Sequence, residues 1–129
     1  MFPVTYMIAV FALSSIPGTV RPDDPFGRGL FIWMPPTVQN TLHVPVFGLL
    51  AWLWCWSLKS WTARIEARVL LAFVLSCLYA ILDEWYQTTV PGRFGSLTDL
   101  LLNVVGVTLG VSIFGWAAGK RVEHPETGP

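Results

Sequence analysis

A cluster of polar side chains lies between residues 83 and 103, in the stretch DEWYQTTVPGRFGSLTDLLLN. It contains three carboxylates, an arginine, a glutamine and an asparagine, although only 12% of the chain is charged. Carboxylates can act as general acids or bases, and the forked guanidinium of arginine suits a carboxylate or a phosphate. Together with a more distant histidine, the residues that could carry such chemistry are Asp83, Glu84, Gln87, Arg93, Asp99, Asn103 and His43.

The elements that position these side chains must form in a strongly apolar chain. Hydrophobic residues make up 53% of the sequence, against about 45–50% in soluble proteins, and the mean hydropathy is +0.57. The 8 basic and 8 acidic residues balance and form no basic run, which argues against nucleic-acid binding. Cys55 and Cys77 fall inside apolar runs, where we expect small buried thiols and neither a disulfide nor a CxxC site.

The apolar residues predict an all-α membrane bundle of about four transmembrane helices. A spanning helix needs about 20 mostly apolar residues, and segments 42–58, 67–87 and 99–118 come close to that length. A shorter run from Phe2 to Ile16 lacks the basic n-region and cleavage site of a signal peptide, so we expect a retained span.

The connecting segments complete this polytopic organisation. Between the first two spans, the apolar segment Leu30 to Trp33, followed by Met34, is expected to lie on the bilayer surface, where tryptophan anchors are common. Residues 120–129 are polar and are expected to form a disordered cytoplasmic tail. The transmembrane domain is therefore predicted to cover residues 1–119.

Lysines and arginines near the span ends predict the orientation. Five lie on the side of the two termini and three on the other side, so the positive-inside rule favours cytoplasmic termini in a multi-pass protein of the cell inner membrane. The residues counted are Lys59, Arg64, Arg68, Lys120 and Arg121 on the first side, and Arg21, Arg28 and Arg93 on the second.

This topology brings the polar residues together at the outer end of the bundle. His43 starts the second span, Asp83 and Glu84 lie near the end of the third, and Asp99 and Asn103 open the fourth. An ionised carboxylate that faces lipid costs a few kcal/mol, so the carboxylates of the third span should point into the bundle or a wet cavity.

The carboxylate pair of the third span has two candidate partners. Gln87 stands four residues after Asp83 and three after Glu84, so both can share it. Arg93, in the following loop, is the second candidate. A buried ion pair of Arg93 with these carboxylates would fix helix packing without any chemical role.

Structural interpretations also exist for the other polar residues. Ser96-x-x-Asp99 fits a capping box that opens the fourth helix, and Asn103 can hydrogen-bond between helices. Pro91-Gly92 is typical of a tight turn between spans.

Two further chemistries find little support in the sequence. A zinc site would need His43 with two of the carboxylates, and neither an HExxH motif nor a Cys/His spacing is present. A nucleophilic Ser14 or Ser15 with His43 lacks an elbow motif. We therefore predict no metal and no cofactor, and His43 can equally be a satisfied core histidine.

Small residues follow a regular spacing in the fourth span. Gly106-x-x-x-Gly110 and Gly115-x-x-x-Gly119 would let helix backbones approach closely. We expect this face to pack against another span of the same chain, and a homo-oligomer through the last span is the alternative.

The polar residues and glycines form one extended motif. It reads Asp83-Glu84-x-x-Gln87, Pro91-Gly92-Arg93, Ser96, Asp99, Asn103, Gly106 and Gly110, preceded by Ser14-Ser15-x-Pro17 and by His43. The motif resembles the signature of the VanZ-like family, and the resemblance covers most of residues 2–115. Many members have an Asp-Lys pair shortly before the histidine and a tyrosine four residues after it, where this chain has Gln39-Asn40 and Phe47.

The resemblance implies a small bacterial membrane protein of the cell envelope, in a family named for a member that raises teicoplanin resistance. Our first hypothesis is a non-enzymatic protein that binds a lipid headgroup, a cell-wall precursor or a glycopeptide in an outward-facing polar pocket. Our second is a membrane-embedded enzyme that modifies a lipid or cell-wall precursor. In it Glu84 or Asp83 would be the general base, His43 an acid or base, and Arg93 a phosphate clamp. A purely structural role for the cluster is the third.

Overall fold

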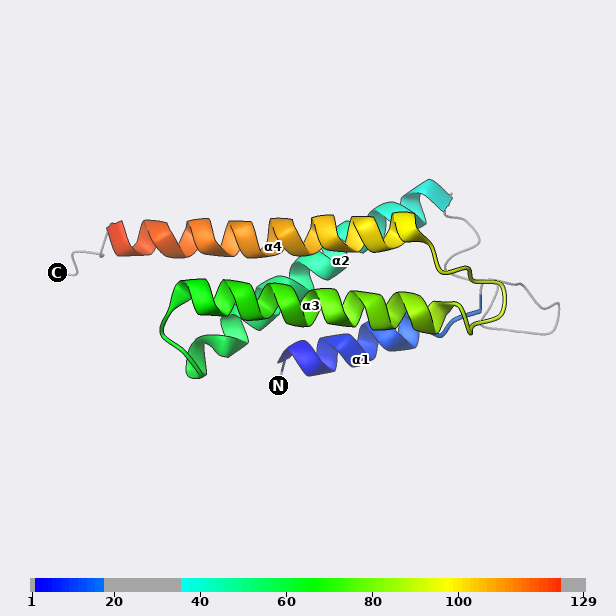
Figure 1. Cartoon of the computed structure of the whole chain (residues 1–129), viewed down its shortest axis with the longest axis horizontal. Coiled ribbons are helices and arrows are strands. Elements are labelled where there is room, and N and C mark those ends of the chain that lie inside the picture. Colours follow the sequence, from blue (N-terminus) through cyan, green and yellow to red (C-terminus); the bar gives the residue numbers. More distant parts are fainter. Residues whose placement is uncertain (1, 18–35, 124–129) are drawn as a thin grey trace.

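The computed structural model places residues 2–17 and 36–123, and every regular element in these ranges is a helix (Figure 1). The segment that was expected to lie on the bilayer surface, Leu30 to Trp33, falls outside the described residues. In chain order the helices are α1 (Phe2–Ser14), α2 (Pro36–Ser57), the short 3-10 helix η1 (Leu58–Ser60), α3 (Ile65–Gln87) and α4 (Leu97–Glu123).

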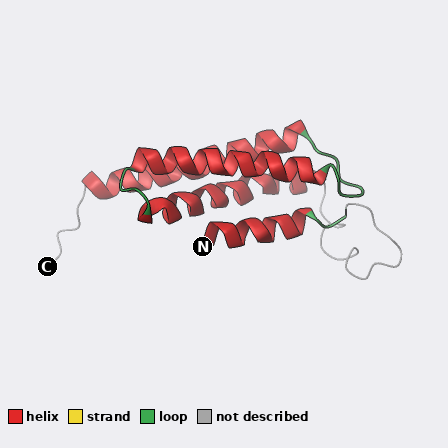
Figure 2. Ribbon diagram, turned by 60° about the horizontal axis from the view of Figure 1, so that its bottom comes forward, coloured by secondary structure: helices red, strands yellow, loops and turns green. Residues whose placement is uncertain are grey.

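Three of the helices are long and apolar enough to cross a membrane. The qualifying segments are Asn40–Ser60, Ile65–Gln87 and Leu97–Lys120. They lie side by side along the long axis of the molecule, with α2 crossing the other two obliquely (Figures 1 and 2). The 13 residues of α1 span about 20 Å at 1.5 Å per residue, which is less than a bilayer core. The predicted all-α membrane bundle is confirmed, with three long helices and a shorter apolar fourth.

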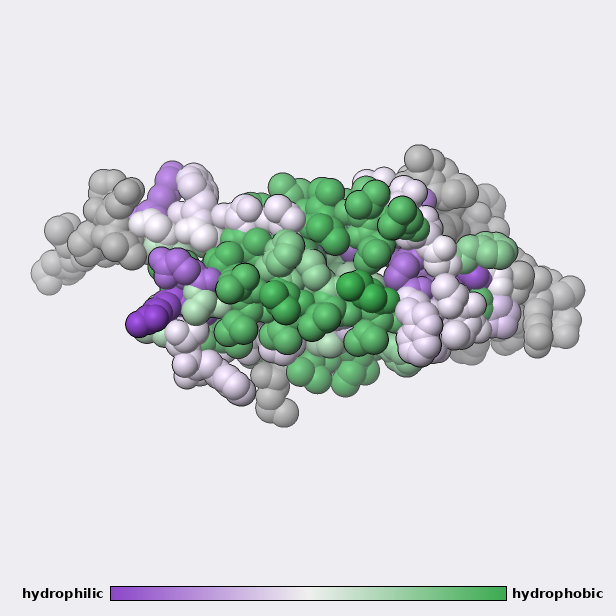
Figure 3. Space-filling model, in the orientation of Figure 1, coloured by the Kyte–Doolittle hydropathy of each residue, from purple (hydrophilic) through white to green (hydrophobic). Residues whose placement is uncertain are grey.

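The bundle has two chemically different ends. At one end α1 and α3 finish and α2 and α4 begin; we call it the polar end, and it contains Ser14, His43, Gln87 and Ser96. The opposite end, here the basic end, carries Lys59, Arg64, Arg68 and Lys120. A belt of hydrophobic side chains separates the two (Figure 3).

The side chains of α3 show how such a bundle differs from a soluble one. Its large apolar residues face outward, and small or polar residues occupy the inner face. The buried residues recur at helical spacing and are Ala72, Ser76, Tyr79, Ala80, Asp83, Glu84 and Gln87. Since lipid offers no hydrogen bonds, polar groups are sequestered inside and leucines cover the surface.

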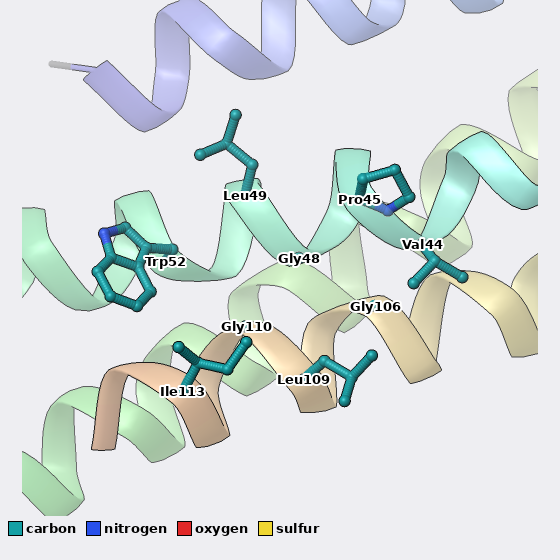
Figure 4. A pocket seen from close by; sticks show the side chains of 9 residues that line it. All are labelled: Val44, Pro45, Gly48, Leu49, Trp52, Gly106, Leu109, Gly110 and Ile113. Carbon is teal, nitrogen blue, oxygen red and sulfur yellow. The ribbon is translucent and has the colours of Figure 1, made fainter. Parts of the chain in front are cut away.

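Glycines allow α2 and α4 to cross in close contact. A Cβ atom at Gly106 would overlap the carbonyl group of Val44, and one at Gly110 would overlap that of Gly48. A Cβ at Gly48 would in turn lie 3.1 Å from the carbonyl oxygen of Gly106. Figure 4 shows the crossing with Gly48 above Gly106. These glycines of the last span therefore pack within the chain, against α2.

An apolar groove runs along the outer side of this crossing. Its volume is about 320 Å³, and it is lined by the helix backbones at the glycines and by larger apolar side chains (Figure 4). The larger side chains are Val44, Pro45, Leu49, Trp52, Leu109 and Ile113.

Helix α4 is longer than the predicted span. It continues to Glu123, so residues 120–123, which were assigned to a disordered tail, are helical. The ammonium of Lys120 lies 4.0 Å from the ring centroid of Trp116 one turn earlier, and a cation near a helix C-terminus is favourable. Residues 124–129 lie outside the described residues.

Candidate functional site

The carboxylates of α3 lie inside the bundle. Asp83 is 3% exposed and Glu84 is 7% exposed. They follow Ser76 by seven and eight residues and Ala80 by three and four, so one helical face carries all four residues inward. The cost of an exposed carboxylate in lipid explains why this face points toward the other helices.

Asp83 belongs to a group of side chains shared with α1. The amide of Gln87 donates to Asp83 Oδ2 at 3.0 Å and reaches Ser14 Oγ at 3.5 Å. Ser14 is buried at the end of α1, so Gln87 is shared between Asp83 and Ser14, and not between Asp83 and Glu84 as its spacing predicted. Oxygen Oδ1 of Asp83 is buried and has no hydrogen-bond partner within the described ranges.

Arg93 is directed at α1, not at the carboxylates. Its Nε donates to the carbonyl of Ile16 at 2.9 Å, Nη2 to that of Leu13 at 3.3 Å, and Nη1 to Gln87 Oε1 at 3.4 Å. The last carbonyls of a helix lack intrahelical donors, so a cation there is favourable. The hydrogen-bonded ion pair of Arg93 with the α3 carboxylates, one of our structural interpretations, is therefore not what holds this arginine.

Burial also sets the electrostatics of Arg93. The loss of solvent lowers the pKa of its guanidinium, and the charges of Asp83 and Glu84 oppose that shift through space. Arginine remains charged under such shifts. Arg93 thus offsets part of the acidic charge of the polar end while its donors serve α1.

Glu84 joins the end of α3 to the start of α4. Its Oε1 accepts a hydrogen bond from the backbone N–H of Ser96 at 2.5 Å. Ser96 Oγ in turn accepts from the N–H of Thr98 at 3.2 Å, which is the expected N-cap contact. In a capping box the Ser96 N–H would bind Asp99, but Glu84 takes that place. Asp99 is left with a buried, unpartnered Oδ1 among the residues we describe.

His43 and Asn103 connect α2 to α4. His43 Nδ1 lies 2.8 Å from Asn103 Oδ1. An amide oxygen only accepts, so Nδ1 is the donor in this contact, and in the neutral tautomer that this requires the lone pair lies on Nε2. The ring of Phe47, one turn along α2, stacks on His43 with centroids 6.3 Å apart. Asn103 is fully buried, and its Nδ2 finds no partner in the described part of the chain.

Five of the seven buried side-chain atoms without a partner among the described residues lie on α3 and α4 between the polar end and Ser76. Three belong to carboxylates, one to an amide and one to the hydroxyl of Ser76, a residue that the sequence reasoning overlooked. Its spacing from Asp83 and Glu84, on the same helical face, was the signal that could have found it. Glu84 also lies within electrostatic reach of Asp99, His43 and Asp83. These atoms are Asp83 Oδ1, Glu84 Oε2, Asp99 Oδ1, Asn103 Nδ2 and Ser76 Oγ.

The arrangement offers acceptor oxygens to hydrogen-bond donors. Between residues 2–17 and 36–123, no three His, Cys, Asp or Glu side chains are grouped as a metal site requires. The α2–α4 groove, in contrast, is apolar and offers no polar ligands. Chemically, the polar end presents acceptor oxygens inside the bundle, near the helix ends.

Comparisons with known proteins identify the family of the chain. No curated protein matches the chain, and no solved structure matches it. A family model described as VanZ/LLP1 matches residues 3–118, which include every residue of the polar cluster. Because this match spans well over half of the sequence, the chain belongs to the VanZ/LLP1 family.

Proposed function

We propose that the protein binds the polar part of a membrane lipid or envelope precursor at its polar end, through hydrogen-bond donors on the ligand. The observation that carries this proposal is the set of unpartnered carboxylate oxygens of Asp83, Glu84 and Asp99. A buried acceptor without a donor costs about 1–3 kcal/mol. A ligand that supplies O–H or N–H groups would recover that cost.

The charges of the polar end favour an ammonium or sugar hydroxyl over a bare phosphate. Three carboxylates gather there, and Arg93 already donates to Leu13, Ile16 and Gln87. We had expected Arg93 to hold an anionic group, and its present contacts give that role less support. Donor-bearing groups occur on lipid headgroups, on lipid-linked cell-wall precursors and on glycopeptides.

The depth of the site agrees with a headgroup ligand. Glu84 follows the first residue of α3, Ile65, by 19 positions, or about 28 Å at 1.5 Å per residue. A bilayer core is about 30 Å thick. With Ile65 at one boundary, the carboxylate would lie just inside the other boundary, below the headgroups.

We further propose an inner-membrane location with both termini in the cytoplasm. Four cationic side chains lie at the basic end of the described bundle, namely Lys59, Arg64, Arg68 and Lys120. Arg93 is at the polar end. The positive-inside rule would direct the basic end to the cytoplasm, so the polar end would face the cell envelope.

A link to teicoplanin-type resistance follows from the family and is open to a direct assay. The minimal inhibitory concentration of teicoplanin would be measured with and without expression of the chain. We expect expression to raise it and Glu84→Gln to cancel the increase. An unchanged value in cells that contain the folded protein would remove glycopeptides from the ligand classes.

One observation favours a second function, acid–base catalysis on the same class of ligand. Because His43 Nδ1 donates to Asn103, the Nε2 lone pair is available as a base, with the Glu84 carboxylate within electrostatic reach. Mass spectrometry of envelope lipids would then differ between cells with the wild type and cells with His43→Asn. Identical lipid profiles would argue for binding without turnover.

Native mass spectrometry of the purified protein tests the binding proposal. The wild type should retain a lipid or precursor that Glu84→Gln loses. Glu66→Gln, which changes an exposed carboxylate at the other end of α3, should retain it. Equal retention by Glu84→Gln and the wild type would contradict the proposal.

A further inference from the structure

Two unpartnered polar groups lie deeper in the bundle: Asn103 is one helical turn beyond Asp99, and Ser76 is about two turns before Glu84. Ser76 and Asn103 are both fully buried, and neither Ser76 Oγ nor Asn103 Nδ2 has a partner among the described residues. Ser76 is on the inner face of α3, and Asn103 is on α4, which packs against it. Their side chains therefore place polar atoms in the bundle interior, away from the lipid headgroups.

The helix register places these two residues at similar depth. The hydrogen bond from Ser96 N–H to Glu84 sets α3 and α4 level at the polar end. Asn103 is seven residues beyond Ser96, and Ser76 is eight before Glu84. At 1.5 Å per residue, both lie about 10–12 Å below that bond. Polar side chains thus continue inward from Glu84, past His43 and Asn103, to Ser76.

No described residue replaces water as a hydrogen-bond partner of Ser76 Oγ or Asn103 Nδ2. In hydrocarbon, with no water to compensate, an unsatisfied polar group costs several kcal/mol. A serine hydroxyl can donate back to its own helix, yet Ser76 Oγ makes no such bond. Ala80 lies four residues from Ser76 and four from Glu84 on the buried face of α3 and carries only a methyl group, while Phe47, Tyr79 and Val107 belong to the same core cluster.

We propose that water enters the bundle from the polar end and hydrates this column of side chains as far as Ser76. The water molecules would satisfy Asn103 and Ser76, as buried waters do when they have polar partners. Ala72, one turn beyond Ser76 on the same face, has no polar side chain and would mark the dry end. This hydration rests on the unpartnered atoms and not on the binding of any lipid.

Cysteine reactivity in native membranes tests the proposal. In a chain with Cys55→Ala and Cys77→Ala, single cysteines would be introduced as Ser76→Cys and Ala80→Cys and labelled with N-ethylmaleimide. The reagent reacts with the thiolate, which forms in water and not in hydrocarbon, so we expect both positions to react at least about tenfold faster than a lipid-facing thiol. Leu78→Cys, whose parent side chain is 54% exposed on the lipid side, is the matched control.

Each outcome bears on the hydrated column. Thr89→Cys at the exposed polar end should label fully, and all variants should label after unfolding in detergent. If Ser76→Cys and Ala80→Cys react no faster than Leu78→Cys, the interior is dry and the proposal is wrong. If Ala72→Cys reacts as fast as Ser76→Cys, the column does not end at Ser76. The labelling rates are measured in chains that keep Glu84, so they do not depend on whether Glu84→Gln loses its lipid. The two proposals can therefore fail separately.

Discussion

The carboxylate of Glu84 accepts the backbone N–H of Ser96, and this contact joins the last turn of α3 to the first residue before α4. One oxygen of the carboxylate holds the helix junction, and the other is unpartnered in the described structure. A single side chain therefore combines a structural contact with an available acceptor.

Substitutions of Glu84 should separate these two roles. Glu84→Ala removes the acceptor for Ser96 N–H, and we expect the free energy of unfolding to fall by about 1–2 kcal/mol, as for a lost helix cap. Glu84→Gln keeps a carbonyl oxygen and should change stability much less. Thermal unfolding in detergent measures both. If the alanine variant is as stable as the wild type, the junction does not depend on this bond.

The α2–α4 crossing predicts opposite effects for two glycines of α4. Gly106→Ala places a methyl group against the Val44 carbonyl, and we expect a loss of about 1–3 kcal/mol from overpacking. A Cβ at Gly119 meets nothing within 4 Å, so Gly119→Ala should be neutral or stabilising by up to about 1 kcal/mol. Unfolding midpoints check both values. A neutral Gly106→Ala would contradict the close crossing.

The Gly119→Ala variant also tests self-association. Gly106 and Gly110 pack against α2, whereas a Cβ at Gly119 meets nothing within 4 Å, so a homo-oligomer through the last span stays the alternative prediction. Molecular mass by light scattering should be the same for the wild type and Gly119→Ala. A dimer that dissociates in Gly119→Ala would identify the second Gly-x-x-x-Gly pair as its interface.

Arg93 should stabilise the C-terminal end of α1. Because its donors bind Leu13 and Ile16, Arg93→Ala should speed amide hydrogen exchange in the last turn of α1 while α4 stays protected. Arg64→Ala at the basic end is the control. If Arg93→Ala leaves the amide protection of α1 intact but abolishes ligand retention, Arg93 binds the ligand and does not stabilise the end of α1.

The proposed orientation is open to labelling from one side. In the cysteine-free chain, Thr89→Cys at the polar end and Ser60→Cys at the basic end are both exposed positions. A membrane-impermeant maleimide added to intact spheroplasts should label only Thr89→Cys. Labelling of Ser60→Cys alone would reverse the orientation and place the carboxylates near the cytoplasm.

Local sequence patterns predicted the helices and which residues meet at the polar end. Hydrophobic length located α2, α3 and α4, and helical spacing aligned Asp83 with Gln87. The partners of charged groups were harder to predict, because they depend on tertiary approach. Nothing near Arg93 in the sequence indicates that α1, 77 residues earlier at Ile16, supplies its acceptor.

The capping box shows the same limit in one motif. Ser96 caps α4 as its residue type predicts, but its backbone N–H donates to Glu84 of α3 and not to the expected partner Asp99. The sequence pattern predicts that a carboxylate accepts the Ser96 N–H. Which carboxylate does so depends on the neighbouring helix α3, which brings Glu84 into contact. Ser76 was overlooked for a different reason, since a lone serine in an apolar run resembles ordinary helix packing.

The most direct test of the central claim compares lipids that differ in hydrogen-bond donors. The purified protein would be offered equal amounts of ethanolamine-headed, glucosyl-headed and choline-headed lipids, and retention would be measured by native mass spectrometry. Ethanolamine and choline lipids share a phosphate, but only ethanolamine carries N–H donors. We predict that the wild type retains a donor-bearing lipid in preference to the choline lipid and that Glu84→Gln loses the preference. Equal retention of all three lipids by the wild type would contradict the account.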